Sequence, residues 1–192
     1  MQQGEEVQST SNNTVAEGLA KQYGIKGVPL LSTLSSLSFP LSFPYDFMHL
    51  IWQNLIPNLI RLWTGSFKDL NHNNKDYVLK RAVWKVIGKA TAAAGKTIPA
   101  AFGSQVPNLS LKKPHMTAEM YSIWTLYLTP ALLKSWFKHK QYYKHFVKLV
   151  QLLTLCLEFE ITHNQIDDLE KGFQQWVQEY KQLVFLLLHK LN

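Results

Sequence analysis

The chain has 192 residues, of which 46% are hydrophobic and 12% aromatic. This composition excludes a wholly disordered chain and suffices for one domain with a buried core. A single cysteine, Cys156, excludes an internal disulfide framework and fits a reducing, intracellular compartment. No apolar run reaches the roughly 20 residues of a membrane-spanning helix, and the polar start carries no secretory signal. We therefore expect a soluble protein with no membrane partner.

The net charge of +7 is distributed unevenly along the chain. Residues 61–148 hold fifteen basic and three acidic side chains, a net charge of +12, whereas the flanking regions carry −2 and −3. A cationic region of this kind favours a polyanionic partner such as DNA, which would make the nucleus its compartment. A solvated lysine face that binds nothing is an equally good interpretation.

In chain order, residues 1–22 are expected to form a disordered tail and residues 23–192 a single helical domain. Residues 24–45 hold three prolines and five serines, which favours an extended segment across the core. From Asp46 onward, apolar residues recur in steps of three and four, which predicts a first helix that Pro57 kinks or divides. The apolar stripe of this helix comprises Phe47, Leu50, Ile51, Leu55, Leu59, Leu62 and Trp63.

Two further helices are predicted in the middle of the chain. Asp76 can cap the start of the second helix, which ends at Gly95. Thr117 opens the third helix, which Pro130 breaks near its middle.

The C-terminal part predicts a fourth helix at residues 139–160 and a long final helix. Thr162 and Gln165 match a capping box at the start of the final helix. Its apolar stripe comprises Ile166, Leu169, Phe173, Val177, Tyr180, Val184, Leu187 and Leu191. Alternation of period two is absent, so the predicted fold class is all-α, with about five helices.

Catalytic and metal-binding motifs give weak signals. The sequence Gly95-Lys96-Thr97 lacks the glycine of a phosphate-binding loop, because Ala90 occupies its position. Asp46 and His49, three residues apart, are the closest pair of potential ligands. They fit a capping aspartate beside an ordinary histidine, or a pair close to a metal. No second pair accompanies them, so we expect neither a bound metal nor another cofactor.

The segment KSWFKHKQYYKHFVK, residues 134–148, interleaves lysines with aromatic residues. Stacking aromatics and phosphate-binding lysines are the two components of single-strand recognition. Trp136, Tyr143, Phe146 and Val147 could equally form a buried stripe, leaving only the lysines at the surface. The candidate DNA-binding residues are Lys134, Lys138, Lys140, Lys144 and Lys148, with Lys112 and Lys113 from the preceding loop.

Several phrases resemble a segment of fungal CACTA-type (En/Spm-like) transposases, and the resemblance covers residues 24–180 of 192. The most specific are FPYDFMHLIWQN and TIPAAFG; YYKHFVKLV and EITHNQIDDLEKGFQQWVQEY follow in the same order. In these enzymes three separated carboxylates of an RNase H-like core hold two divalent metals. The resemblance places this chain in the largely helical region inserted between the second and third acids, where Asp46 and His49 align with an Asp-x-x-His motif.

The departures from the family imply a fragment of a transposable-element enzyme. The chain lacks the region that carries the first two catalytic acids, and residues 181–192 diverge from the family pattern. We therefore expect no self-sufficient catalysis, since two-metal chemistry needs carboxylates on both metals and only a full-length transposase would hold them. The expected activity is sequence-independent DNA binding. The alternatives are a protein-interaction module, which binds a related transposase or a second copy, and a relic without function.

Overall fold

The computed structural model describes residues 2–38, 42–43, 45–67, 75–99, 101, 103–112 and 114–185. Most of these residues are helical and none of them lies in a strand, which confirms the all-α fold class. None of the described helices is both long and apolar enough to cross a lipid bilayer. The chain divides into two compact units, Met1–Asp46 and Phe47–Asn192, so the boundary lies further along the chain than expected.

The first unit contains two helices where a disordered tail was expected. They are α1, Gln2–Ser9, and α2, Asn13–Tyr23. The side chain of Asn12 accepts hydrogen bonds from the first turn of α2, and Gly24 ends the helix with a φ of 71°. A short 3₁₀-helix, Leu30–Thr33, interrupts the segment that was expected to be extended.

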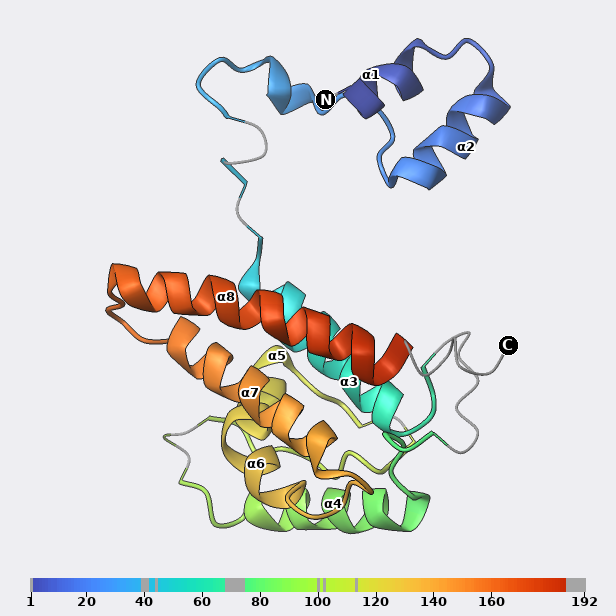
Figure 1. Cartoon of the computed structure of the whole chain (residues 1–192). Coiled ribbons are helices and arrows are strands. Elements are labelled where there is room, and N and C mark those ends of the chain that lie inside the picture. Colours follow the sequence, from blue (N-terminus) through green and yellow to red (C-terminus); the bar gives the residue numbers. More distant parts are fainter. Residues whose placement is uncertain are drawn as a thin grey trace. The chain divides into compact units, whose positions relative to one another are not determined.

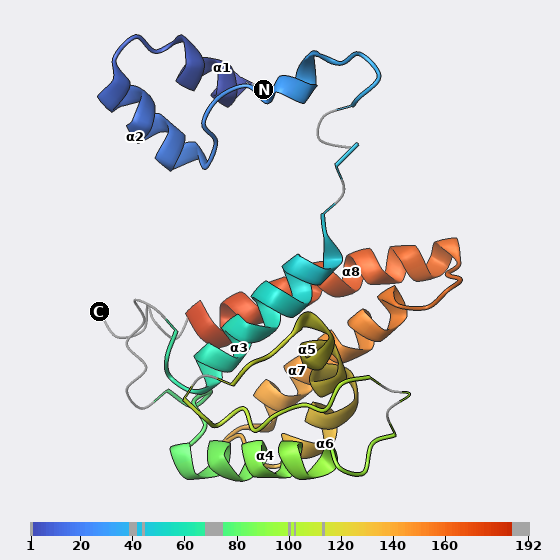
Figure 2. The same ribbon diagram turned by 180° about the vertical axis from the view of Figure 1, so that it is seen from behind.

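The second unit contains five continuous helical segments among its described residues. Figure 1 and Figure 2 show their arrangement from two sides. Helices α7 and α8 lie side by side, and α4 packs against α6 and the π-helical stretch before it. The segments, in order, are η2 Met48–Leu55 continuing into α3 Ile56–Trp63; α4 Arg81–Ala94; α5 Ala118–Ile123, η4 Trp124–Leu128 and α6 Thr129–Leu132; α7 Lys140–Cys156; and α8 His163–Tyr180 with η5 Lys181–Phe185.

Both prolines inside predicted helices widen the preceding helix to π geometry, and the helix continues through each of them. The N–H of Ile56 donates to the carbonyl of Ile51, and that of Thr129 donates to the carbonyl of Trp124, each five residues back. A proline ring collides with the carbonyl four residues before it, and a wider turn relieves that collision. The predicted break at Pro130 is therefore replaced by a change of helix type.

The π-helical stretch η2 also changes which residues of the first helix are buried. Side chains five residues apart share a face in it, so Phe47 meets Trp52 edge-on at 5.8 Å between ring centroids. Trp52 and Ile56 are buried, whereas Leu50, which the 3- and 4-residue steps place in the core, is 47% exposed. The stripe predicted for this helix is therefore wrong at Leu50 and lacks Trp52 and Ile56. Ile51 is buried as predicted.

Local capping signals give the expected ends at several helices. Thr117 accepts a hydrogen bond from the N–H of Met120 at the start of α5, and Thr162 and Gln165 form the predicted capping box of α8. Gly95 follows the last residue of α4. Asp76 is different, because α4 begins only at Arg81, and the predicted cap at Asp76 is wrong.

Aromatic contacts join distant segments within the core of the second unit. Trp63 meets Phe146 edge-on at 5.1 Å, and Trp84 meets Trp124 edge-on at 6.2 Å. The indole N–H of Trp124 donates to the hydroxyl of Thr91, so this fully buried ring keeps a hydrogen-bond partner. These contacts hold α3, α4 and α7 around the segment Ala118–Leu132.

Candidate nucleic-acid interface

The turn at residues 133–139, between α6 and α7, is fixed by two buried anchors. Leu133 is fully buried, and Phe137 is 8% exposed. The ring of Phe137 meets that of Trp63 edge-on at 5.7 Å and packs on Tyr142 at 6.1 Å. Of the three residues between these anchors, Trp136 is 45% exposed. Its position at the surface is therefore set by well-packed neighbours.

Ser135, immediately before Trp136, has a φ of 124°. Among the described residues it is the only one other than glycine with a positive φ. Such a conformation is costly for a residue with a Cβ and persists only where the surroundings impose it. The turn therefore holds its exposed tryptophan at the expense of local backbone strain.

An acidic residue from before α4 holds the other end of this turn. The ammonium group of Lys138 donates to one Asp76 oxygen at 2.6 Å, and His139 Nε2 lies 3.2 Å from the other. The hydrogen bond from Lys138, with its charge and that of a protonated His139, holds the pKa of the Asp76 carboxyl below its ordinary value. Asp76 thus links two segments that are 62 residues apart in sequence.

The segment that carries Asp76 is itself fixed to the core. Tyr77 and Leu79 are buried, and the N–H of Leu79 donates to the carbonyl of Trp63 at 2.8 Å. Burial raises the pKa of the Tyr77 hydroxyl. Lys75 lies before these two buried residues and the exposed Lys80 follows them.

Together the two segments line a hollow of about 750 Å³, which we call the Trp136 hollow. Its charged side chains are three lysines and one aspartate, which gives a net charge of +2. Its apolar lining consists of three aliphatic side chains and the indole ring of Trp136. The lining residues are Lys75, Asp76, Val78, Leu79, Lys80, Val83, Trp136 and Lys138. The site therefore combines an aromatic ring with several ammonium groups.

The lysines predicted from sequence do not form one surface. Lys138 lines the Trp136 hollow, whereas Lys144 and Lys148 line a second hollow, of about 360 Å³, with Glu179 and other residues of α7 and α8. Lys148 is half-buried and donates to Glu179 at 2.9 Å, so its charge is offset within the fold. Lys134 and Lys140 are exposed and line neither hollow.

The two remaining predicted lysines, Lys112 and Lys113, precede α5 in the sequence. Lys112 is exposed and lines neither of these hollows. Lys113 lies outside the described residues.

The sequence left open whether the aromatic residues of this region form a stacking surface or a buried stripe, and the structure shows both exposed and buried rings. Phe146 is buried, and Tyr143 is half-buried, with its hydroxyl donating to the carbonyl of Pro130 at 2.7 Å. These two rings belong to the core. Trp136 is the one of the predicted set that is exposed beside lysines.

Basic residues that the sequence interpretation missed lie on and before α4. Arg81, Lys85 and Lys89 are exposed, four residues apart on one helix face, and α4 contains no acidic residue. Lys75 and Lys80 of the hollow were missed as well. The four-residue spacing was visible in the sequence, but the pairing of residues 75–80 with the turn at 133–139 was not.

Asp46 and His49 are both exposed, and they fall in different units. Asp46 is the last residue of the first unit, and His49 lies in the first turn of η2 in the second. In the described part of the chain, no group of three or more His, Cys, Asp or Glu side chains could hold a metal ion. Burial raises the pKa of the Cys156 thiol.

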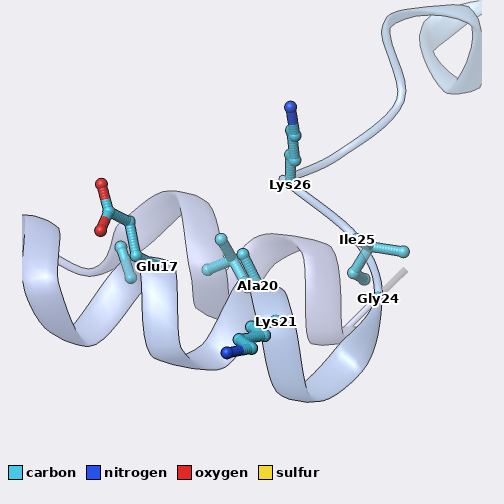
Figure 3. A pocket seen from close by; sticks show the side chains of 8 residues that line it. Glu17, Ala20, Lys21, Gly24, Ile25 and Lys26 are labelled. Atoms are coloured by element: carbon cyan, nitrogen blue, oxygen red, sulfur yellow. The ribbon is translucent and has the colours of Figure 1, made fainter. Parts of the chain in front are cut away.

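A third hollow, of about 660 Å³, lies within the first unit (Figure 3). It is lined by α1, α2 and the segment after α2. Its charged side chains, Glu17, Lys21 and Lys26, point in different directions and do not converge on a common point. The Trp136 hollow is therefore the better candidate for a binding site.

Comparison of the chain with protein-family models, curated proteins and solved structures gives no match.

Proposed function

We propose that this chain is a transposase-derived helical module that binds DNA without sequence preference through basic residues of the region 61–148. The observation that carries the proposal is the Trp136 hollow, which is lined by Lys75, Lys80 and Lys138 and by a single carboxylate. The stripe of Arg81, Lys85 and Lys89 on α4 supports it, because no acid on that helix offsets its charge. Ammonium and guanidinium groups contact phosphates, which carry no base information.

The salt dependence of binding tests this proposal. Each phosphate that the protein neutralises should contribute a slope of about 0.9 to the fall of log affinity with log salt concentration on duplex DNA. The variant with Lys134, Lys138, Lys140 and Lys144 replaced by glutamine should bind unrelated duplexes more weakly and with a flatter slope. Fluorescence anisotropy with labelled duplexes of two different sequences measures both quantities.

A variant of equal charge provides the control. Lys21, Lys26, Lys171 and Lys181 are exposed and lie outside residues 61–148. Replacing these four by glutamine also reduces the net charge from +7 to +3. This control should bind much as the parent does. If the two variants bind alike, only overall charge matters and the basic region is a solvated face.

The proposal includes binding without strand cleavage. Asp46 and His49, the residues aligned with the family motif, are exposed and lie in different units. We expect supercoiled plasmid to remain intact with magnesium or manganese. Nicking that disappears in Asp46→Ala would contradict this expectation and make Asp46 a metal ligand.

A protein-interaction module is the second candidate, because the connection between α7 and α8 exposes three large apolar side chains. Leu157, Phe159 and Ile161 are exposed, and Phe159 is completely so, at 106%. Ile166, in the first turn of α8, is 46% exposed. This candidate predicts association with a related transposase or a second copy that Phe159→Ser weakens, with no salt-dependent DNA binding.

A further inference from the structure

We propose that the Trp136 hollow binds an unpaired nucleobase, stacked on the Trp136 ring, with the flanking phosphates on Lys75, Lys80 and Lys138. The chain would then prefer single-stranded DNA, or the open ends of a duplex, to continuous duplex. This inference rests on the proposed DNA binding and makes it more specific.

The chemistry of the hollow matches a nucleotide in two respects. A half-exposed indole offers a flat face for a base, and the ammonium groups of the same hollow can meet the phosphates on either side. In a continuous duplex both faces of each base are covered by its neighbours. An exposed ring can therefore stack only where a base is unpaired.

The fold holds Trp136 in place before any ligand arrives. Leu133 and Phe137 are buried on either side of it in the chain. Asp76 binds Lys138 and His139 and so links the turn to the segment before α4. The positive φ of Ser135 shows that the turn keeps this form against a local conformational cost. An aromatic ring that is fixed beforehand loses little freedom when a base stacks on it.

Asp76 gives the hollow a second testable property. Its carboxylate engages the ammonium group of Lys138, which is 68% exposed, and cancels part of the positive charge. If that ammonium group meets a phosphate, Asp76 competes for it. On an abasic strand, where Trp136 has no base to stack on, the variant Asp76→Asn should therefore bind more tightly than the parent, which a merely damaged fold would not do.

The experiment uses the full chain and three labelled oligonucleotides, each about 20 nucleotides or base pairs long, which exceeds the site size of a typical single-strand-binding groove. They are oligothymidylate, an abasic strand of equal length, and a blunt duplex. Fluorescence anisotropy should show tighter binding to oligothymidylate than to the abasic strand. Loss of one stacked base in Trp136→Ala should weaken oligothymidylate binding about tenfold and leave abasic binding unchanged. Trp136→Phe should restore part of the affinity. Phe159→Ala removes another exposed ring and should change nothing.

The outcomes separate this inference from the proposed function. If all three ligands bind with the expected salt slope, but Trp136→Ala has no effect on any of them, base stacking is wrong and DNA binding stands. If Asp76→Asn binds the abasic strand no more tightly than the parent, Lys138 does not meet a phosphate and the inference is wrong in that part. If no ligand binds at low salt, both proposals fail.

Discussion

His145 and Trp176 exchange hydrogen bonds where α7 packs against α8. The indole N–H of Trp176 donates to the His145 carbonyl at 3.0 Å, and His145 Nε2 lies 3.0 Å from the Trp176 carbonyl. Because a carbonyl only accepts, Nε2 carries the proton. The two rings stack with their centroids 4.6 Å apart, and Tyr180 continues the stack. This pair is the centre of the α7–α8 interface.

The substitution Trp176→Ala should lower the free energy of unfolding by about 3 kcal/mol or more. It removes a ring that is 5% exposed and leaves a cavity against His145 and Tyr180. Urea unfolding followed by circular dichroism measures the change. Gln175→Ala, at the exposed neighbouring position, is the control and should stay within about 0.5 kcal/mol of the parent. Equal stability of both variants would show that α8 packs differently.

Acidification should destabilise the protein through His145. Burial lowers the pKa of His145 below its ordinary value of 6.5, with Lys148 acting in the same direction and the Trp176 carbonyl and Glu179 opposing. The unfolded chain therefore takes up this proton at a higher pH than the folded one. The free energy of unfolding should fall as pH drops below about 6.5. Urea unfolding on either side of that pH, at about 7.5 and about 5.5, tests it. His145→Gln should show a smaller fall, and an identical fall would assign the effect to other groups.

The substitution Ser135→Gly should raise the free energy of unfolding by about 1 kcal/mol, because glycine adopts a positive φ without the clash of a Cβ. Ser122→Gly provides a control of opposite sign. Ser122 lies inside α5, where glycine should cost about 1 kcal/mol. Thermal unfolding compares the two. A decrease in stability in Ser135→Gly would mean that the turn is not strained.

The substitution Gly88→Ala should destabilise the second unit although alanine favours a helix. A Cβ on Gly88 would lie 2.9 Å from the Ser110 backbone nitrogen and would also collide with the Asn108 side chain. We expect the free energy of unfolding to fall by about 1–3 kcal/mol, measured by urea unfolding. Gly18 in α2 has no atom within 4 Å of its added Cβ, so Gly18→Ala should raise helix content. A stabilised Gly88→Ala variant would contradict the close packing of the loop on α4.

The stripe on α4 should contribute to DNA binding. Replacing Arg81, Lys85 and Lys89 by glutamine should flatten the salt slope, by about 0.9 on duplex DNA for each phosphate that the variant no longer neutralises. The control replaces Lys21, Lys26 and Lys171, which removes the same charge elsewhere. Unchanged binding in the α4 variant would confine the interface to the Trp136 hollow.

The sequence predicted what depends on residues close together in the chain. Thr162 and Gln165 form their capping box within a single turn, and Gly95 ends α4, because such signals act locally. Asn12 and Gly24 are local signals of the same kind for α2, and the expectation of a disordered tail did not use them.

Single positions in two helices were predicted wrongly, because burial depends on more than local spacing. In the first helix the repeat changes from π to α geometry, so no single period fits both halves, and Leu50 was placed inside instead of Trp52. In the final helix Trp176 is buried, whereas Val177, which the predicted stripe includes, is 43% exposed.

The candidate site was only partly visible in the sequence, since it forms between two segments about 60 residues apart. The alternation of lysines and aromatic residues at 134–148 pointed to the right region. Whether Trp136 or Phe146 faces solvent depends on which ring packs against Trp63, a long-range interaction that no local pattern encodes. Asp76 was assigned to a helix cap for the same reason, because its true partner, Lys138, is distant in sequence.

The widened turns before Pro57 and Pro130 determine how these helices respond to a change in chain length. A π turn holds about one residue more than an α turn, so deleting Gln53 would return η2 to α geometry and keep the downstream side chains in phase. The same deletion within α7 would rotate every later side chain by about 100°. The deletion in η2 would also restore the collision at Pro57, which Pro57→Ala removes. Deletion of the extra residue in η2 should therefore be tolerated only together with replacement of Pro57.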